Sequence, residues 1–152
     1  MIQTMMITAS GLDRLKAELA DLVDHKRPQL VDRLSFARSQ GDLSENSDYQ
    51  SAKEDLAFAD GRIAELEELV KNAKVVAPKI NGQVDFGNSV SVKVGEREAA
   101  FQIVGEWEAD PAKKKISHTS PLGRALMGKK VGEQVEVAAP AGKILYTVTA
   151  IE

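Results

Sequence analysis

The sequence predicts an α+β protein in which a long helical hairpin precedes a small β domain. Apolar residues recur every three or four positions in the first half of the chain and every second position in the second half, and Pro78 lies near the change. The first spacing is typical of packed helices and the second of half-buried strands. These patterns predict a hairpin over residues 1–76, a linker over 77–83 and a sheet domain over 84–152.

The first helix is expected to follow Thr8, whose hydroxyl is a good N-cap. Around Pro28 its apolar stripe is interrupted, and the proline lacks the backbone N–H that would donate to the preceding turn. We therefore expect a kink or a register shift at Pro28, after which the helix resumes. The stripe comprises Leu12, Leu15, Leu19, Leu22, Leu30, Leu34 and Ala37.

The second helix carries a heptad seam, which is sustained long enough to predict a coiled coil. Between the two helices the chain contains Gly41 and a run of turn-forming and capping residues, which predicts a tip near residues 41–47. Two long helices joined by a short break must run antiparallel, and a helix of about 30 residues is about 45 Å long. The seam comprises Tyr49, Ala52, Leu56, Ala59, Ile63, Leu66, Val70 and Ala73.

Beyond the linker, alternating apolar residues predict four short strands of a small antiparallel sheet. Ser120 as N-cap, Pro121 at the first helical position and Gly128 beyond the end predict one short helix that covers a face of the sheet. The expected strands contain Val90, Val92 and Val94; Phe101 and Ile103; Val135 and Val137; and Ile144, Tyr146 and Val148.

Composition and charge exclude several classes of function. The 152 residues include no cysteine, so disulfides, thiolate metal sites and cysteine nucleophiles are excluded. Neither half is a basic domain that would bind nucleic acid through its phosphates, because residues before Pro78 carry 10 basic against 14 acidic side chains and the remainder 10 against 9. The chain shows no apolar run of about 20 residues and no signal peptide, so we expect a cytoplasmic protein without membrane contact.

Asp42 and Glu45 are the candidate chemical pair at the tip, where packing does not need them. Mg²⁺ prefers six oxygen ligands and keeps several waters, so two carboxylates form half a site that a partner would complete. The alternative is structural: Asp42 as N-cap and Glu45 reaching back would form a capping box for the second helix. Acid-rich helix starts are common, so the spacing alone favours capping over catalysis.

Basic side chains near the tip have two interpretations. Arg33, Arg38 and Lys53 could contact phosphate, but such residues are more often the solvated face of a coiled coil, paired with acids such as Asp32 and Asp55. Charge balance favours the solvated face.

The tip also carries a resemblance to a known family. Residues 37–49 read A-R-S-Q-G-D-L-S-E-N-S-D-Y, which closely resembles the tip signature A-R-x-x-G-D-L-x-E-N-x-x-Y of the GreA/GreB transcript-cleavage factors. Further matches run through the chain in order. They include Arg27-Pro28, Gly61-Arg62-Ile63, Asn72-Ala73-Lys74-Val75, Val104-Gly105, Ser120-Pro121-Leu122-Gly123 and Ala125-Leu126-Met127-Gly128-Lys129.

The resemblance implies an antiparallel coiled coil followed by an FKBP-like domain that docks at the secondary channel of bacterial RNA polymerase. The coiled coil then enters the channel, and Asp42 and Glu45 hold a Mg²⁺ shared with the polymerase, so that backtracked RNA is cut near its 3′ end. The protein would be no enzyme on its own, and we expect a monomer that binds no metal tightly alone. The resemblance also implies DNA binding. The resemblance assigns tip positioning or RNA contact to Asn46, Tyr49, Arg38 and Lys53, and polymerase docking to Ser120, Pro121 and Leu122.

Three alternatives remain open. A regulator of the same fold could enter the channel and inhibit the polymerase, although the intact tip signature argues against inhibition. A coiled-coil adaptor would have no catalytic role. A prolyl isomerase is disfavoured because aromatic residues are scarce, and Trp107 between Glu106 and Glu108 indicates a surface loop. Within the family, the net negative hairpin favours the GreA type, which releases short fragments.

Overall fold

The computed structural model describes residues 4–41 and 46–152, and it divides into two compact units. The first comprises Leu12–Ala73, and the second comprises Thr4–Gly11 together with Lys74–Glu152. The sequence division ran the hairpin from residue 1 to 76, whereas the contacts group Thr4–Gly11 with the sheet. None of the helices in the described residues is long and apolar enough to cross a membrane.

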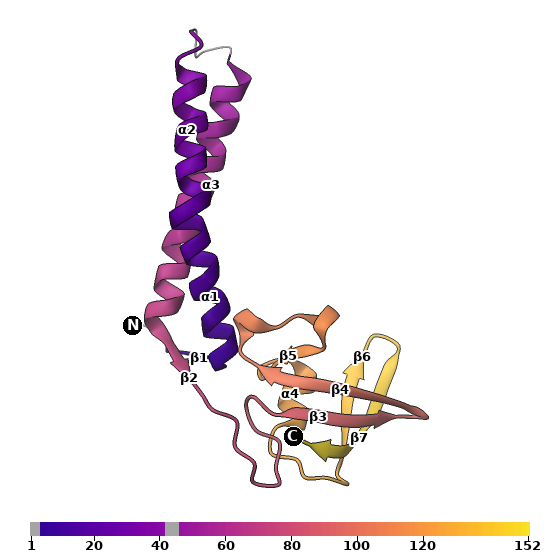
Figure 1. Ribbon diagram of the computed structural model, residues 1–152. Coiled ribbons are helices and arrows are strands. Elements are labelled where there is room, and N and C mark those ends of the chain that lie inside the picture. Colours follow the sequence, from indigo (N-terminus) through magenta and orange to yellow (C-terminus); the bar gives the residue numbers. More distant parts are fainter. Residues whose placement is uncertain (1–3, 42–45) are drawn as a thin grey trace. The chain divides into compact units, whose positions relative to one another are not determined.

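The first unit is the expected helical hairpin (Figure 1). Its first arm contains α1 (Ala9–Asp21), a π-helical turn (Leu22–Lys26) and α2 (Arg27–Arg38), and its second arm is α3 (Ser47–Asn72). The seam predicted for α3 is buried or half-buried throughout, with Ala52 and Leu66 fully buried. On the first arm, Leu15, Leu22 and Ala37 are buried against it.

The register shift expected at Pro28 is confirmed. Pro28 lies in the first turn of α2, and the backbone N–H of Arg27 donates to the carbonyl of Leu22, five residues back. This wider turn lets the chain reach proline without a helical bond at its nitrogen, since a π-turn inserts one extra residue into the ladder. The first arm continues through the turn as one helical segment.

Ion pairs bridge the two arms along the exposed sides of the hairpin. Arg62 on α3 donates from Nε and Nη2 to the two carboxylate oxygens of Glu18 on α1, at 2.8 and 3.0 Å, and from Nη1 to Glu65 at 2.9 Å. Further along, Arg27 donates to Asp60 at 2.7 Å. The hydrogen bond from Arg62, with its positive charge, outweighs partial burial and lowers the pKa of Glu18 below its ordinary value.

This lowered pKa predicts a pH-dependent contribution to hairpin stability. A carboxyl whose pKa falls on folding stabilises the fold above its unfolded pKa, near 4.5, and loses that contribution as the pH drops through the folded value. Glu18→Gln should lower the thermal midpoint by about 2–4 °C at pH 7, because exposed pairs contribute up to about 1 kcal/mol.

Thermal melts followed by circular dichroism at 222 nm between pH 7 and pH 3 check this expectation. The difference between wild type and Glu18→Gln should shrink below pH 4.5. Glu67→Gln, which changes an exposed acid on α3, should show little difference at pH 7. A gap for Glu18→Gln that stays constant down to pH 3 would contradict the ionic origin.

The second unit contains a five-stranded sheet in the order β5-β4-β3-β7-β6, with a separate two-stranded pair β1-β2. The four predicted strands are confirmed, and the sequence missed β1, β2 and β5. The strands are β1 (Met5–Ile7), β2 (Ala73–Val75), β3 (Ser89–Val94), β4 (Arg97–Val104), β5 (Lys115–Ser117), β6 (Gln134–Ala139) and β7 (Gly142–Ile151).

The sheet is mixed, which corrects the expected all-antiparallel arrangement. β3 pairs antiparallel with β4 and β7, and β6 with β7, but β5 runs parallel to β4 with Ile103 opposite Ile116. A parallel neighbour needs a crossover, and residues 105–114 supply it through two short helical turns, Glu106–Glu108 and Pro111–Lys113. Three residues with one lysine are too short to show alternation, so β5 escaped prediction.

The core of this unit is aliphatic and lies between the sheet and α4 (Pro121–Leu126), the predicted short helix. Leu126 at the end of α4 is fully buried among strand side chains. The α+β class predicted from the sequence is therefore confirmed. The buried core residues are Val84, Val90, Val92, Ile103, Leu126, Val135 and Val148.

Candidate functional site at the hairpin tip and on helix α4

The predicted tip acids, Asp42 and Glu45, lie outside the described residues, so the site is defined by what flanks them. On the first arm α2 ends at Arg38, where Ser39 closes the helix by donating its backbone N–H to Ser35 and its hydroxyl to the carbonyl of Phe36 at 2.6 Å. Gly41 follows with φ +112°, a conformation that favours glycine. The first arm therefore ends at a defined turn before the acids.

Asn46 defines the other side of the tip. Its Oδ1 accepts the backbone N–H of Tyr49 at 3.0 Å, which makes Asn46 the N-cap of α3. Its Nδ2 donates to the carbonyl of Ala37 at 2.9 Å, near the end of α2. One side chain thus satisfies an open donor of α3 and an open acceptor of α2, and it links the two arms directly beside the acids.

This geometry corrects the capping interpretation of the acids. That interpretation required Asp42 as the N-cap of the second helix, but α3 begins at Ser47 and Asn46 occupies the cap position. The sequence contained the signal, since Asn is among the best N-cap residues. The D-x-x-E spacing instead predicted Asp42 as the N-cap, which is wrong.

The basic residues near the tip are paired or exposed, whereas Tyr49 is partly packed between the helices. Arg33 donates to Asp55 at 2.9 Å, to Asp48 at 3.3 Å and to Ser51 at 3.1 Å, so it belongs to the solvated face of the hairpin. Its carboxylate partners, Asp55 first, raise its pKa further. Tyr49 is half-buried on the seam, whereas Arg38 and Lys53 are exposed. Their proposed RNA contacts remain predictions.

The predicted docking residues surround the start of α4. Ser120 is the N-cap, with Oγ accepting the N–H of Gly123 at 3.1 Å and donating to the carbonyl of Ser117 at 2.6 Å. Pro121 is exposed at the first helical position, and Leu122 is half-buried against the core. A Cβ on Gly123 would lie 2.0 Å from the Ser117 carbonyl oxygen, so glycine is required there.

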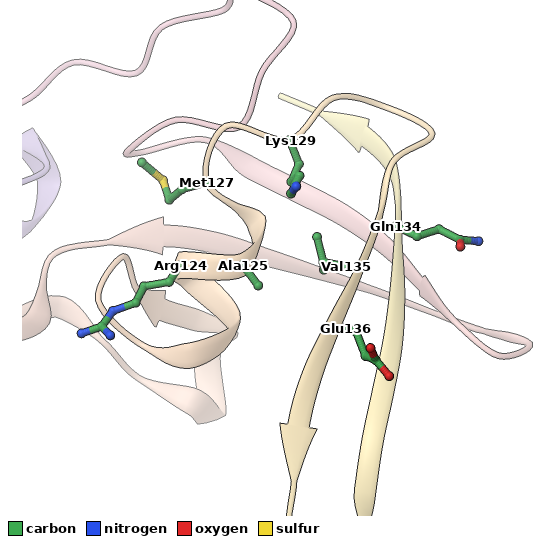
Figure 2. A pocket seen from close by; sticks show the side chains of 7 residues that line it. All are labelled: Arg124, Ala125, Met127, Lys129, Gln134, Val135 and Glu136. Carbon is green, nitrogen blue, oxygen red and sulfur yellow. The ribbon is translucent and has the colours of Figure 1, made fainter.

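A cavity of about 450 Å³ lies between the later half of α4 and strand β6 (Figure 2). Arg124 and Lys129 supply two cations, and Met127 contributes an apolar side. Lys129 is 3.8 Å from Glu133, a weak pair. The cavity adjoins the helix that begins with the predicted docking residues, and its lining holds the acid Glu136 as well as the two cations. Its lining is Arg124, Ala125, Met127, Lys129, Gln134, Val135 and Glu136.

The 105–108 turn contains a residue that the sequence analysis misjudged. Trp107 is 52% exposed, as expected for a surface loop, but Glu108 is buried. Its carboxylate accepts hydrogen bonds from Thr8 and Gly105. Alternation of acids around a tryptophan carries no signal for burial, because the partner lies 100 residues earlier in the chain.

Comparison with known proteins covers nearly the whole chain. Residues 5–75 match the family model "Transcription elongation factor, N-terminal", and residues 78–152 match "Transcription elongation factor, GreA/GreB, C-term". The chain belongs to the GreA/GreB family of transcription elongation factors.

Similar GreA/GreB proteins come from several bacterial species. The chain is 46% identical to transcription elongation factor GreA of Lactococcus lactis subsp. cremoris (strain MG1363), with 100% of both chains covered. It is 45% identical to GreA of Clostridium acetobutylicum, covering 97% of this chain and 96% of that one. A solved structure of the transcription factor Gfh1 matches with a TM-score of 0.50 at 25% identity, covering 100% of this chain and 99% of that one.

Proposed function

We propose that this GreA/GreB-family protein stimulates bacterial RNA polymerase to cut backtracked nascent RNA. In this proposal the sheet unit docks at the polymerase through Ser120, Pro121 and Leu122, and the hairpin enters the secondary channel. The polymerase owns the phosphodiesterase centre and this chain supplies the tip, so it is not an enzyme alone. It acts in the cytoplasm as a monomer, and its acidic hairpin favours GreA-type release of short fragments.

The N-cap of α3 is the observation that carries this proposal. Because Asn46 caps the helix and bonds to Ala37, neither Asp42 nor Glu45 is needed for that structural task. The helix behind the tip has 26 residues, a length of about 39 Å. A pair of acids at the end of such an arm suits delivery into a deep active centre.

The donor chemistry of the tip fits Mg²⁺, a hard cation that prefers carboxylate oxygens. Asp42 and Glu45 would hold it, and when bound it supplies polarisation of water and phosphate. Two side chains leave most of its ligand positions to polymerase, RNA and water, so the free chain should bind it weakly. Within the described residues no group of three or more acids or histidines forms a further metal site.

Cleavage in stalled, backtracked polymerase complexes tests the proposal. Adding the wild-type protein should increase release of short 3′ fragments by about a hundredfold or more, equivalent to about 2.7 kcal/mol of barrier. Binding measured in the same complexes by fluorescence anisotropy separates the alternatives. Binding without cleavage, together with slowed elongation, would favour the inhibitory regulator, and binding without any effect on the RNA would favour the adaptor.

A further inference from the structure

Glu108 is a buried carboxylate with three donors around it. It is 9% exposed, and its Oε2 accepts the backbone N–H of Thr8 at 2.9 Å and that of Gly105 at 3.3 Å. Its Oε1 accepts the hydroxyl of Thr8. Burying a carboxylate is costly unless hydrogen bonds replace its water. Glu108 is the one charged member of the buried polar set in the described residues, so this site is specifically built.

Two of the three donors belong to Thr8, which directly precedes α1, the helix with which the hairpin begins. Thr8 caps α1, as the sequence predicted, by accepting the N–H of Gly11 at 3.1 Å on Oγ1. A carboxylate at this end is also favoured by the partial positive charge of the free N–H groups. Glu108 therefore completes the cap from a distant part of the chain, and Thr4–Gly11 belongs to the same compact unit as Glu108.

Two glycines lie in close contact with this arrangement. A Cβ on Gly11 would lie 2.0 Å from Oε1 of Glu108, and a Cβ on Gly105 would lie 2.3 Å from the carbonyl oxygen of Met6. Neither glycine has a positive φ, so backbone freedom does not explain them. Close packing does, of Gly11 against the Glu108 side chain and of Gly105 against the backbone of Met6. We call Thr8, Gly11, Gly105 and Glu108 the root clasp.

We propose that Glu108 is a positioning residue that anchors residues 4–11, from which α1 continues into the hairpin, within the second unit, and that cleavage stimulation depends on this anchoring. The inference rests on the proposed function. The first arm is helical from Ala9 to Arg38, about 45 Å, and a 10° rotation at its root would displace the far end by about 8 Å. Misplacement of about 1 Å can cost a hundredfold in rate.

The test combines two measurements on the full-length chain. The first is cleavage in backtracked complexes as a function of protein concentration. Glu108→Ala should lower the maximal rate about tenfold to a hundredfold and leave the half-saturating concentration within about twofold. Glu108→Gln should stay within about threefold of wild type, because its amide oxygen can accept both N–H groups and its amide nitrogen can donate to the Thr8 hydroxyl. Glu98→Ala removes an exposed acid as the control.

The second measurement is hydrogen exchange of the free protein, which needs no polymerase. Glu108→Ala should increase exchange in residues 4–11 and leave β3 and β4 protected, while Glu108→Gln restores protection. If Glu108→Ala fails to fold, Thr8→Val removes the hydroxyl that donates to Glu108 and accepts the Gly11 N–H, and it should shift both readouts in the same direction. Unchanged exchange, an unchanged maximal rate, or loss of rate explained entirely by weaker binding would overturn the inference. If wild type itself fails to stimulate cleavage, the proposed function fails, while the exchange data still decide the clasp.

Discussion

Replacing Asp42 with asparagine and Glu45 with glutamine should reduce cleavage stimulation by about a hundredfold or more, with polymerase binding unchanged. The amides keep the size of the side chains and remove the negative charge that Mg²⁺ needs from its ligands. The cap of α3 should survive the change, because Asn46 supplies it. The measurement is fragment release over time from backtracked complexes at saturating protein.

A charge-matched control separates the effect of losing the tip carboxylates from the effect of changing the net charge of the hairpin. Asp32→Asn with Glu54→Gln removes the same net charge from exposed positions of the two arms, and it should leave cleavage within about twofold, since exposed charges interact weakly at physiological salt. If the tip double variant cleaves as well as wild type, the acids have no catalytic role and the proposed mechanism is wrong.

The periodic elements were accessible from the sequence because their signals are local. The α3 seam recurs along the whole helix, and the strands that end at Gly95 or begin near Val135 alternate cleanly. Pro28 predicted a register shift because its missing N–H affects one helical turn. Ser120 and Pro121 predicted α4 because capping depends on neighbouring residues. In each case the physical cause lies within a few residues of its effect.

The features that escaped prediction depend on distant partners. Strand β5 forms because the edge of β4 is free to pair with it. A segment of three residues carries no periodic pattern from which this pairing could be predicted. Glu108 is buried because Thr8 and Gly105 donate hydrogen bonds to it. From the local sequence alone, a glutamate beside a tryptophan is expected to be exposed to solvent. The tip could be predicted only in part. The cap that Asn46 forms depends on neighbouring residues, but its second hydrogen bond, to Ala37, spans nine residues. The chemistry of a half-site likewise depends on groups that belong to a partner.

Asn46 yields the second large expected effect, because one side chain has two separable tasks. Asn46→Ala removes both the cap on Tyr49 and the bond to Ala37, and loss of a cap costs about 0.5–2 kcal/mol of stability. The acids lie between these anchors in the chain, so we expect the maximal cleavage rate to fall about tenfold to a hundredfold. Polymerase binding should change little, because the proposed docking residues lie in the other unit.

Asn46→Asp distinguishes the two tasks. Aspartate is an equally good N-cap, but its carboxylate cannot donate to the Ala37 carbonyl and would repel it. We therefore expect the α3 cap to be kept and the cleavage rate to be as low as that of Asn46→Ala. Ser47→Ala, an exposed position beside it, should remain close to wild type. Wild-type cleavage by Asn46→Asp would show that the cap alone positions the tip and that the link to α2 is dispensable.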